Sequence, residues 1–347
     1  VPTEGDAAVT GPLQLNGSAA LRVRCWEEGK LPGETATFHY ILNEGHTLPV
    51  LCLAIDPEDM FGHYTGIYVA GAHKNYFQDW EKVCNLAYFD GKGSVSLDCG
   101  LKMHGAGSRE TSQKKSLKVN FRGAYGAKTL EYDLFGNGRT SFDSLVIRAG
   151  EDYNRAFIRE ELFTSLAAEG CPELITQDFQ YVALYLNGEF FGIFCMKERL
   201  NADTYAEKIH VPEETCQVVS AGNGLGRDFM ALYQYAYSHD MTDPECFAYM
   251  EERVDFDSVI DWTVFEAYSG NPDISGNVRY AYSSEEGKWR FCLYDLDWAF
   301  GGEAFLHAAA DGEIPLQCVF QRPDQEPGVP GPVPDPDGGA AGRRAGQ

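Results

Sequence analysis

The chain has 347 residues, 44% of them hydrophobic and 13% aromatic, which is enough apolar material for one large globular domain and a smaller neighbour. Its 28 Lys and Arg residues against 52 Asp and Glu give a formal net charge of −24. A surface this acidic repels nucleic acid and anionic membranes, because phosphate binding requires clustered cations. We therefore expect no nucleic-acid partner. No stretch approaches roughly 18 uninterrupted apolar residues, so we expect no membrane span either.

The N-terminal part predicts a small β module. Residues 20–42 contain two alternating runs around a Gly/Pro turn, a pattern typical of a β-hairpin. A new apolar run follows, so we expect residues 1–45 to be the C-terminal part of that module. The chain begins at Val1 with no initiator Met and no secretory signal, which predicts a fragment and leaves the export route open.

The C-terminal part changes in composition. Residues 323–347 are rich in Pro, Gly, Asp and Arg and cannot bury enough apolar surface to offset the entropy of ordering. We therefore expect a globular domain over residues 46–305, truncated at its C-terminal end, and a disordered tail over 306–347. The 10 cysteines show no CxxC pair and no zinc spacing, so buried free thiols are expected rather than a disulfide framework.

Two helices are predicted inside the globular part. Residues 154–170 have helical apolar spacing, with Asn154 as the N-cap and Gly170 as the end. Residues 256–273 form an apolar-rich helix that Gly270 terminates, delivering Asp273 into a loop.

Two strand regions are also predicted. Residues 101–121 are a glycine-rich turn followed by a strand, and residues 181–200 are a hairpin. The hairpin turns at Asn187 and Gly188, the dipeptide that a type I′ turn prefers.

Residues 293–303 read LYDLDWAFGGE and place Asp295 and Asp297 where an alternating strand ends. An EF-hand is excluded, because positions six and twelve of that loop would be Phe300 and Leu306. Two carboxylates at a strand exit suit a hard divalent cation that bridges to phosphate oxygens. A bare pair of this kind is more often a strand-end turn with solvated acids, and only its context favours the metal.

That context is the segment NPDISGN, in which Asn277 follows Asp273 by four residues and precedes another strand. A carboxylate, then Asn, then a strand and a metal-type Asp is the order used in phosphoryl transfer. The first Asp takes the hydroxyl proton there, and the Asn and later Asp hold Mg²⁺. Taken alone, NPD is an ordinary turn that stops a helix.

The N-terminal half supplies candidate counter-charges. Alternation places Lys115 on the apolar face of its strand and Lys118 on the other, and an inward Lys requires a carboxylate or phosphate partner. Glu198, at the exit of the predicted hairpin, is one such partner, although it can equally be a surface acid. A glycine turn can wrap phosphates with its backbone N–H groups through Gly105, Gly107, Ser108 and Arg109.

These segments together resemble the spore-coat-protein-H (CotH) kinase family, atypical protein kinases of bacterial envelopes and spore coats. The resemblance runs from about His46 to Gly302 and is carried by these pieces: GAGSR with QKKSLKVNF, LVIRAGEDYNRAFIREEL, LYLNGEFFGIFCMKERLN, the NPD…N loop and WRFCLYDLDWAFG. Residues 20–45 also resemble the tail of a chitobiase-type β module. The resemblance implies an α+β fold of divergent protein-kinase type in a secreted or envelope-associated protein.

The resemblance also implies roles for individual residues. Asp273 would match the catalytic aspartate, Asp295 the metal-binding aspartate and Asn277 a second metal ligand. Lys115 would match the phosphate-contacting lysine, with Glu198 as its partner. Lys118, Arg148 and Asp297 fit the motifs in supporting roles, Lys118 and Arg148 towards the nucleotide and Asp297 towards the metal.

The function implied is a Mg²⁺-dependent kinase that transfers the γ-phosphoryl group of ATP to Ser/Thr hydroxyls of envelope or coat-type proteins. An alternative is a non-catalytic adhesion or scaffold protein of the bacterial envelope that retains the fold. A hydrolase that uses Asp273 and Asp295 as a carboxylate pair ranks last, because that mechanism has no use for Lys115 or the GAGSR turn.

Overall fold

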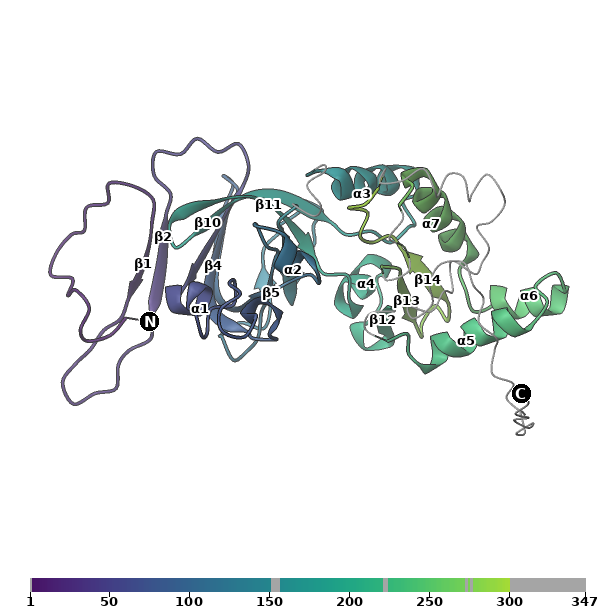
Figure 1. The fold of residues 1–347 in the computed structure, drawn as a ribbon, viewed down its shortest axis with the longest axis horizontal. Coiled ribbons are helices and arrows are strands. Elements are labelled where there is room, and N and C mark those ends of the chain that lie inside the picture. Colours follow the sequence, from purple (N-terminus) through teal and green to yellow (C-terminus); the bar gives the residue numbers. More distant parts are fainter. Residues whose placement is uncertain (1, 151–156, 221–223, 272–273, 275–276, 300–347) are drawn as a thin grey trace, which may run out of the picture.

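The computed structural model describes residues 2–150, 157–220, 224–271, 274 and 277–299. Figure 1 shows a two-stranded hairpin at one end, a β-barrel beside it, and a half rich in helices at the other end. The mixture of helices and strands agrees with the predicted α+β class. The closed barrel is a feature that the sequence did not predict.

Seven of the described strands pair edge to edge into the barrel, in the order β10-β11-β9-β6-β5-β4-β3. Neighbouring strands run antiparallel except β3 and β10, which pair in parallel and close the ring. The bounds are β3 Val50–Ile55, β4 Lys82–Phe89, β5 Ser94–Met103, β6 Leu117–Asn120, β9 Ser144–Arg148, β10 Phe179–Leu186 and β11 Glu189–Glu198.

Alternation along these strands fills the barrel. Successive side chains of a strand point to opposite faces, so every second residue faces inward. Leu51 and Leu53 of β3, and Leu117 and Val119 of β6, are fully buried in this core. Short elements occupy the connections: α1 Pro57–Phe61, η1 Asn75–Phe77, α2 Ser108–Thr111, β7 Leu130–Glu131 and β8 Ser141–Phe142.

A second core forms in the helical half, around the three-stranded sheet β12-β13-β14. Phe229, Trp262 and Phe291 are buried in it, and Trp262 of α7 lies 5.6 Å from Phe291 of β14, centroid to centroid. The bounds are α3 Arg159–Gly170, α4 Ala202–Ile209, η3 Glu213–Thr215, β12 Cys216–Ser220, α5 Arg227–Ser238, α6 Pro244–Glu251, α7 Phe256–Ser269, β13 Arg279–Ser283 and β14 Trp289–Cys292. None of the described helices combines the length and apolarity needed to cross a bilayer.

The two predicted hairpins are confirmed. Strands β1 (Ala19–Val23) and β2 (Ala36–Tyr40) pair antiparallel, and His39 Nε2 of β2 lies 2.9 Å from Asn85 Oδ1 on the barrel strand β4. The β10–β11 hairpin turns at Asn187 and Gly188, whose φ angles of 52° and 87° are those of a type I′ turn.

The two predicted helices differ in outcome. Helix α7 ends as expected at Gly270, which adopts the left-handed conformation with φ 57°. Helix α3 begins at Arg159, later than predicted, and Asn154 lies outside the described residues. Among the described residues no side chain caps α3, but Glu160 and Glu161 occupy its first turn, where carboxylates interact favourably with the helix dipole.

The β10–β11 turn yields a stability prediction. A Cβ on Gly188 would lie 2.6 Å from Ala19 Cα, and the residue has positive φ as well. Gly188→Ala should therefore lower the free energy of unfolding by about 2–4 kcal/mol, measured by urea unfolding.

Gly91→Ala is the matched control, because Gly91 has φ 80° and a Cβ added to it would meet nothing within 4 Å. We expect it to cost about 1 kcal/mol, from backbone strain alone. Equal losses in the free energy of unfolding of the two variants would show that Ala19 of β1 moves away from the added Cβ at no energetic cost.

Candidate functional site

The barrel strands carry a row of cations on the face turned away from the barrel core. The strand register places Lys102, Lys118, Val146 and Lys197 opposite one another across β5, β6, β9 and β11. Directly opposed residues of antiparallel strands share a face. Arg148 follows Val146 by two residues, so it lies on this face as well.

Lys197 is buried between two glutamates of helix α3. Its side chain is 2% exposed, and its Nζ lies 2.9 Å from Glu160 Oε1 and 2.9 Å from Glu161 Oε1. These are ion-pair distances without hydrogen-bond alignment, since Nζ has no hydrogen-bond partner among the described residues. The Tyr181 hydroxyl on β10 donates to Glu161 Oε2 at 3.0 Å. Charge attraction thus fastens α3 to the barrel.

Arg148 joins this cluster to the two aspartates that follow β14. Its Nη1 donates to Asp295 Oδ1 at 3.2 Å and its Nη2 to Asp297 Oδ2 at 2.9 Å. The same Nη2 lies 3.4 Å from Glu160 Oε2. The structure therefore brings the predicted residues Arg148, Asp295 and Asp297 together at one point.

The charges of the cluster set the protonation of Glu160. Burial acts to raise the pKa of Glu160, but the positive charges of Arg148 and Lys197 outweigh it and lower the pKa to about 2. Burial likewise opposes the charge of Lys197, while the two glutamates raise its pKa. Two cations face four carboxylates here, a formal excess of two negative charges.

Asp295 has an unusual backbone. Its φ of 61° lies in the left-handed region, which is uncommon for a residue other than glycine. Such strain is found most often at functional sites, where surrounding contacts maintain it. Among these contacts, Asn271 Nδ2 donates to Asp295 O at 3.4 Å and to Glu266 Oε2 of α7 at 3.1 Å.

Asn277 lies at the same end of the β13–β14 hairpin as Asp295. Asn277 precedes β13, and Asp295 follows β14, its antiparallel partner. The backbone N–H of Asn277 donates to Ile274 O at 3.0 Å. Asp273 lies outside the described residues.

Oxygen ligands for a metal are therefore few. In the part of the chain that the structure describes, no group of three or more His, Cys, Asp or Glu side chains is placed to hold a metal ion. Asp295 and Asp297 supply two carboxylates at one point. That number is what Mg²⁺ takes from proteins in sites where substrate phosphates complete its shell, so these residues fit the ion.

The GAGSR turn follows β5 but does not lead directly into a strand. Gly105 has φ 96°, and Gly107 is the N-cap of the short helix α2, which the structure inserts between the predicted turn and the predicted strand, now β6. Arg109 Nη1 donates to Tyr76 O at 3.3 Å, and its Nε is buried without a hydrogen bond to the described residues.

His104 is buried within reach of the positive charges of several cations, among them Arg148 and Lys118 of this face. Burial, followed by the positive charges of Arg148, Lys118, Arg109 and Arg199, lowers the pKa of His104 to about 3. The imidazole is therefore neutral at physiological pH. Burial, with Arg199 and Lys102, also lowers the pKa of Lys118, to about 8.

Lys115 makes other contacts than Lys118. It precedes β6 rather than lying on it, and its Nζ donates to Ser112 O and lies 5.4 Å from the centre of the Tyr76 ring. Lys115 and Lys118 therefore make different contacts, but strand alternation does not place Lys115, which lies outside β6. However, the face that carries Arg148 and Lys197 is the face of Lys118.

The predicted pairing of Lys115 with Glu198 is wrong. Glu198 is fully buried and accepts from Arg139 Nη1 at 2.8 Å, and Lys208 Nζ lies 2.8 Å from its other oxygen. The reason is alternation, because Glu198 follows Lys197 on β11 and must point to the opposite face. Burial raises the pKa of Glu198, and Lys208 opposes that rise.

Sequence reasoning missed Lys197, Glu160 and Glu161. One signal was incomplete, since the Asn187-Gly188 turn fixes the pairing of Leu186 with Glu189, but the register shifts between Leu184 and Tyr185, before Lys197 is reached. Two adjacent glutamates in the first turn of a largely apolar helix were a second signal.

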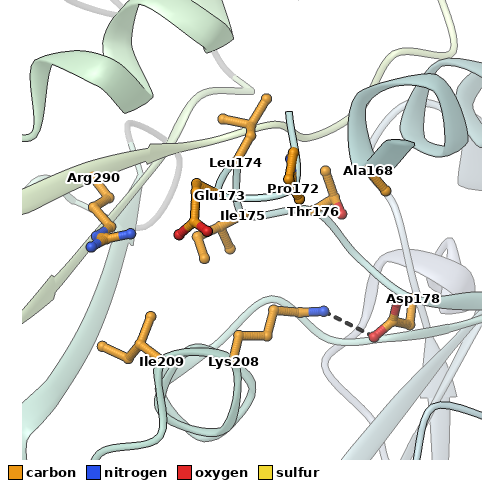
Figure 2. A pocket seen from close by; sticks show the side chains of 10 residues that line it. All are labelled: Ala168, Pro172, Glu173, Leu174, Ile175, Thr176, Asp178, Lys208, Ile209 and Arg290. Atoms are coloured by element: carbon orange, nitrogen blue, oxygen red, sulfur yellow. Dashed lines mark hydrogen bonds and ion pairs between the residues drawn. The ribbon is translucent and has the colours of Figure 1, made fainter. Parts of the chain in front are cut away.

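A small cleft lies apart from this cluster, between the α3–β10 connection, α4 and β14 (Figure 2). Its volume is about 250 Å³. Its cations are already paired, Lys208 with Asp178 at 2.9 Å and Arg290 with Glu286 at 3.1 Å. Neither cation of the cleft is therefore without a carboxylate counter-ion.

The depressed pKa of Glu160 predicts a pH-dependent contribution to stability. Folding favours its ionised form, so the contribution is full above the ordinary value of 4.5 and is lost as the pH falls towards 2. At pH 7, Glu160→Gln should lower the free energy of unfolding by about 3 kcal/mol. The difference from the parent, measured by urea unfolding, should shrink between pH 5 and pH 3.

Glu252→Gln serves as the control, because the Glu252 side chain is 74% exposed. It should differ little from the parent at any pH. A deficit of Glu160→Gln that stays constant from pH 7 to pH 3 would show that its charge does not hold the cluster.

Comparison with known proteins places the chain in a family. The family model described as CotH kinase protein matches residues 101–236 and 220–324, which together span 101–324. No curated protein matches the chain. The matched region includes the GAGSR turn, Arg148, Lys197 and both aspartates after β14. Since it covers more than half of the sequence, the chain belongs to the CotH kinase protein family.

Proposed function

We propose that the protein is an atypical protein kinase that transfers the γ-phosphoryl group of ATP to Ser/Thr hydroxyls and requires Mg²⁺. The observation that carries the proposal is the cluster in which Arg148 and Lys197 meet Glu160 of α3 and Arg148 also meets Asp295 and Asp297. Protein kinases require a strand cation paired with a helix glutamate and a metal-binding aspartate held beside them.

The chain order of these parts supports the proposal. A glycine turn lies between β5 and β6, a cation on β9 is followed by a glutamate on α3, and an aspartate follows β14. Protein kinases carry a glycine-rich loop, a strand lysine, a helix glutamate and a metal-binding aspartate in the same order. Here the helix glutamate meets two cations, and the one in the strand-lysine position is Arg148.

The roles of the residues follow from this scheme. Asp273 would accept the proton of the acceptor hydroxyl, and Lys118 and Lys197 would offset phosphate charge on the outer face of the barrel. Asp295, with Asn277 and Asp297, would hold Mg²⁺, which when bound neutralises charge on the phosphoryl group. The GAGSR turn would cover the phosphates.

The remaining expectations are part of the same proposal. By family resemblance, the protein would act outside the cytosol, on envelope or coat-type proteins. The β1–β2 hairpin would be the end of a chitobiase-type module. A scaffold without catalysis would share this location and this fold, so nucleotide binding is what separates the two functions.

The first test concerns the two aspartates. Asp295→Asn removes an anionic ligand with little change in shape, so it should weaken both Mg·ATP binding and transfer, and raised Mg²⁺ should partly restore binding. Asp273→Asn should abolish transfer but leave binding largely intact. Each loss in transfer should be on the order of a hundred- to several-thousand-fold. Calorimetry measures the binding of Mg·ATP, and labelled ATP with a generic acceptor protein measures phosphoryl transfer.

Asp228→Asn is the control for this pair, since Asp228 is an exposed residue of α5, 73% accessible. It should match the parent in both assays. A parent protein whose melting temperature does not rise with Mg·ATP, and which transfers no phosphate, would favour the scaffold.

The second test compares two lysines. Lys118 shares the face of Lys197, whereas Lys115 precedes β6 and its Nζ donates to Ser112 O, so Lys118→Ala should weaken ATP binding about tenfold and Lys115→Ala little. Calorimetric titration of both variants measures the ranking. The reverse ranking would place the nucleotide beside Lys115 and Tyr76 rather than on the outer face.

A further inference from the structure

Two cysteines face each other inside the barrel. Cys84 on β4 and Cys99 on β5 are direct partners in the antiparallel ladder, and both are 0% exposed. Opposed residues of antiparallel strands have Cα atoms about 4.5–5.5 Å apart. A disulfide spans Cα separations of roughly 4.4–6.8 Å, so this pair meets the distance requirement without movement of the strands.

The other strand cysteines of the described chain have no such partner. Cys52 lies opposite Ala87, Cys216 opposite Ser283, and Cys292 opposite Arg279. Cys195 lies opposite Tyr181 and Arg148. The fold thus selects one pair from the scattered cysteines of the sequence.

We propose that Cys84 and Cys99 form a disulfide when the chain folds in the presence of a disulfide oxidant, such as oxidised glutathione or an oxidoreductase disulfide. The thiolate of one cysteine attacks the oxidant and releases one thiol, leaving a mixed disulfide. The second cysteine then attacks its protein sulfur and releases the second thiol. The protein loses two electrons and two protons, and the oxidant disulfide is reduced to two thiols.

The barrel also sets when this reaction can occur. A hydrogen bond to the Cys84 thiol, together with burial, raises the pKa of Cys99 well above its usual value. The attacking species is the thiolate, and an oxidant must reach it, so the closed barrel is unreactive. Exchange therefore takes place while β4 and β5 are still open to solvent.

Refolding tests the proposal directly. The reduced, denatured parent is refolded with either a glutathione redox mixture or excess reductant, and free thiols are then alkylated in denaturant. Trypsin releases Cys84 in residues 83–92 and Cys99 in residues 93–102, so mass spectrometry should find these two peptides linked after oxidative refolding only. Alkylation of both cysteines in the oxidised, folded fraction, or their linkage to other cysteines, would overturn the proposal.

Two variants control the stability readout. Cys52→Ala removes an equally buried strand cysteine, 1% exposed, that has no cysteine opposite it. Oxidative refolding should raise the melting temperature of the parent and of Cys52→Ala by about 5 °C and leave Cys99→Ala unchanged. If Cys99→Ala does not fold, Cys99→Val takes its place. The detection of linked peptides is made on the parent protein and does not depend on either variant.

The timing is tested on folded, reduced protein given the same glutathione mixture. It should form the linked peptide at least tenfold more slowly than refolding protein does. Equal rates would overturn the requirement for an open barrel. This inference does not depend on the proposed kinase activity, so it stands or fails separately.

Discussion

The ion cluster around Lys197 determines how the barrel meets the helical half of the molecule. Removing an ammonium group from water costs several kcal/mol, and only close carboxylates recover that cost. Glu160 and Glu161 provide them from the first turn of α3, and Arg148 carries the connection on to Asp295 and Asp297. The barrel, helix α3 and the end of the β13–β14 hairpin share one set of charges. A shift of α3 would therefore leave the buried cation Lys197 without its carboxylate partners.

An apolar core would hold these elements together at least as strongly, since buried ion pairs are seldom the most stable solution. What the charges add is a defined orientation of the paired groups. Each carboxylate has a fixed counter-ion, and the guanidinium of Arg148 holds two aspartates at once in a defined orientation. Asp295 has its left-handed backbone in the same arrangement, so the contacts of Arg148 give both carboxylates a defined orientation.

Local signals in the sequence were sufficient for the parts that local physics decides. Asn187 and Gly188 specify their turn, and Gly270 ends its helix. Long-range pairing was beyond the same reasoning. Alternation cannot say which face of a strand meets α3, so Lys197 was overlooked in favour of its neighbour. The barrel was missed because its closing pair joins β3 to β10, far along the chain.

That closing pair has a consequence for how the protein is made. β3 pairs in parallel with β10, and all the other barrel strands except β11 are synthesised between them. Folds dominated by such distant contacts form slowly, because the chain loses the conformational entropy of a long loop before the new contacts offset that loss. Until β10 has been synthesised, the edge of β3 that will pair with it exposes unpaired backbone N–H and C=O groups. A strand of another chain can pair with such an edge. The nascent N-terminal half is therefore the stage at which the protein is most exposed to aggregation and most dependent on chaperones.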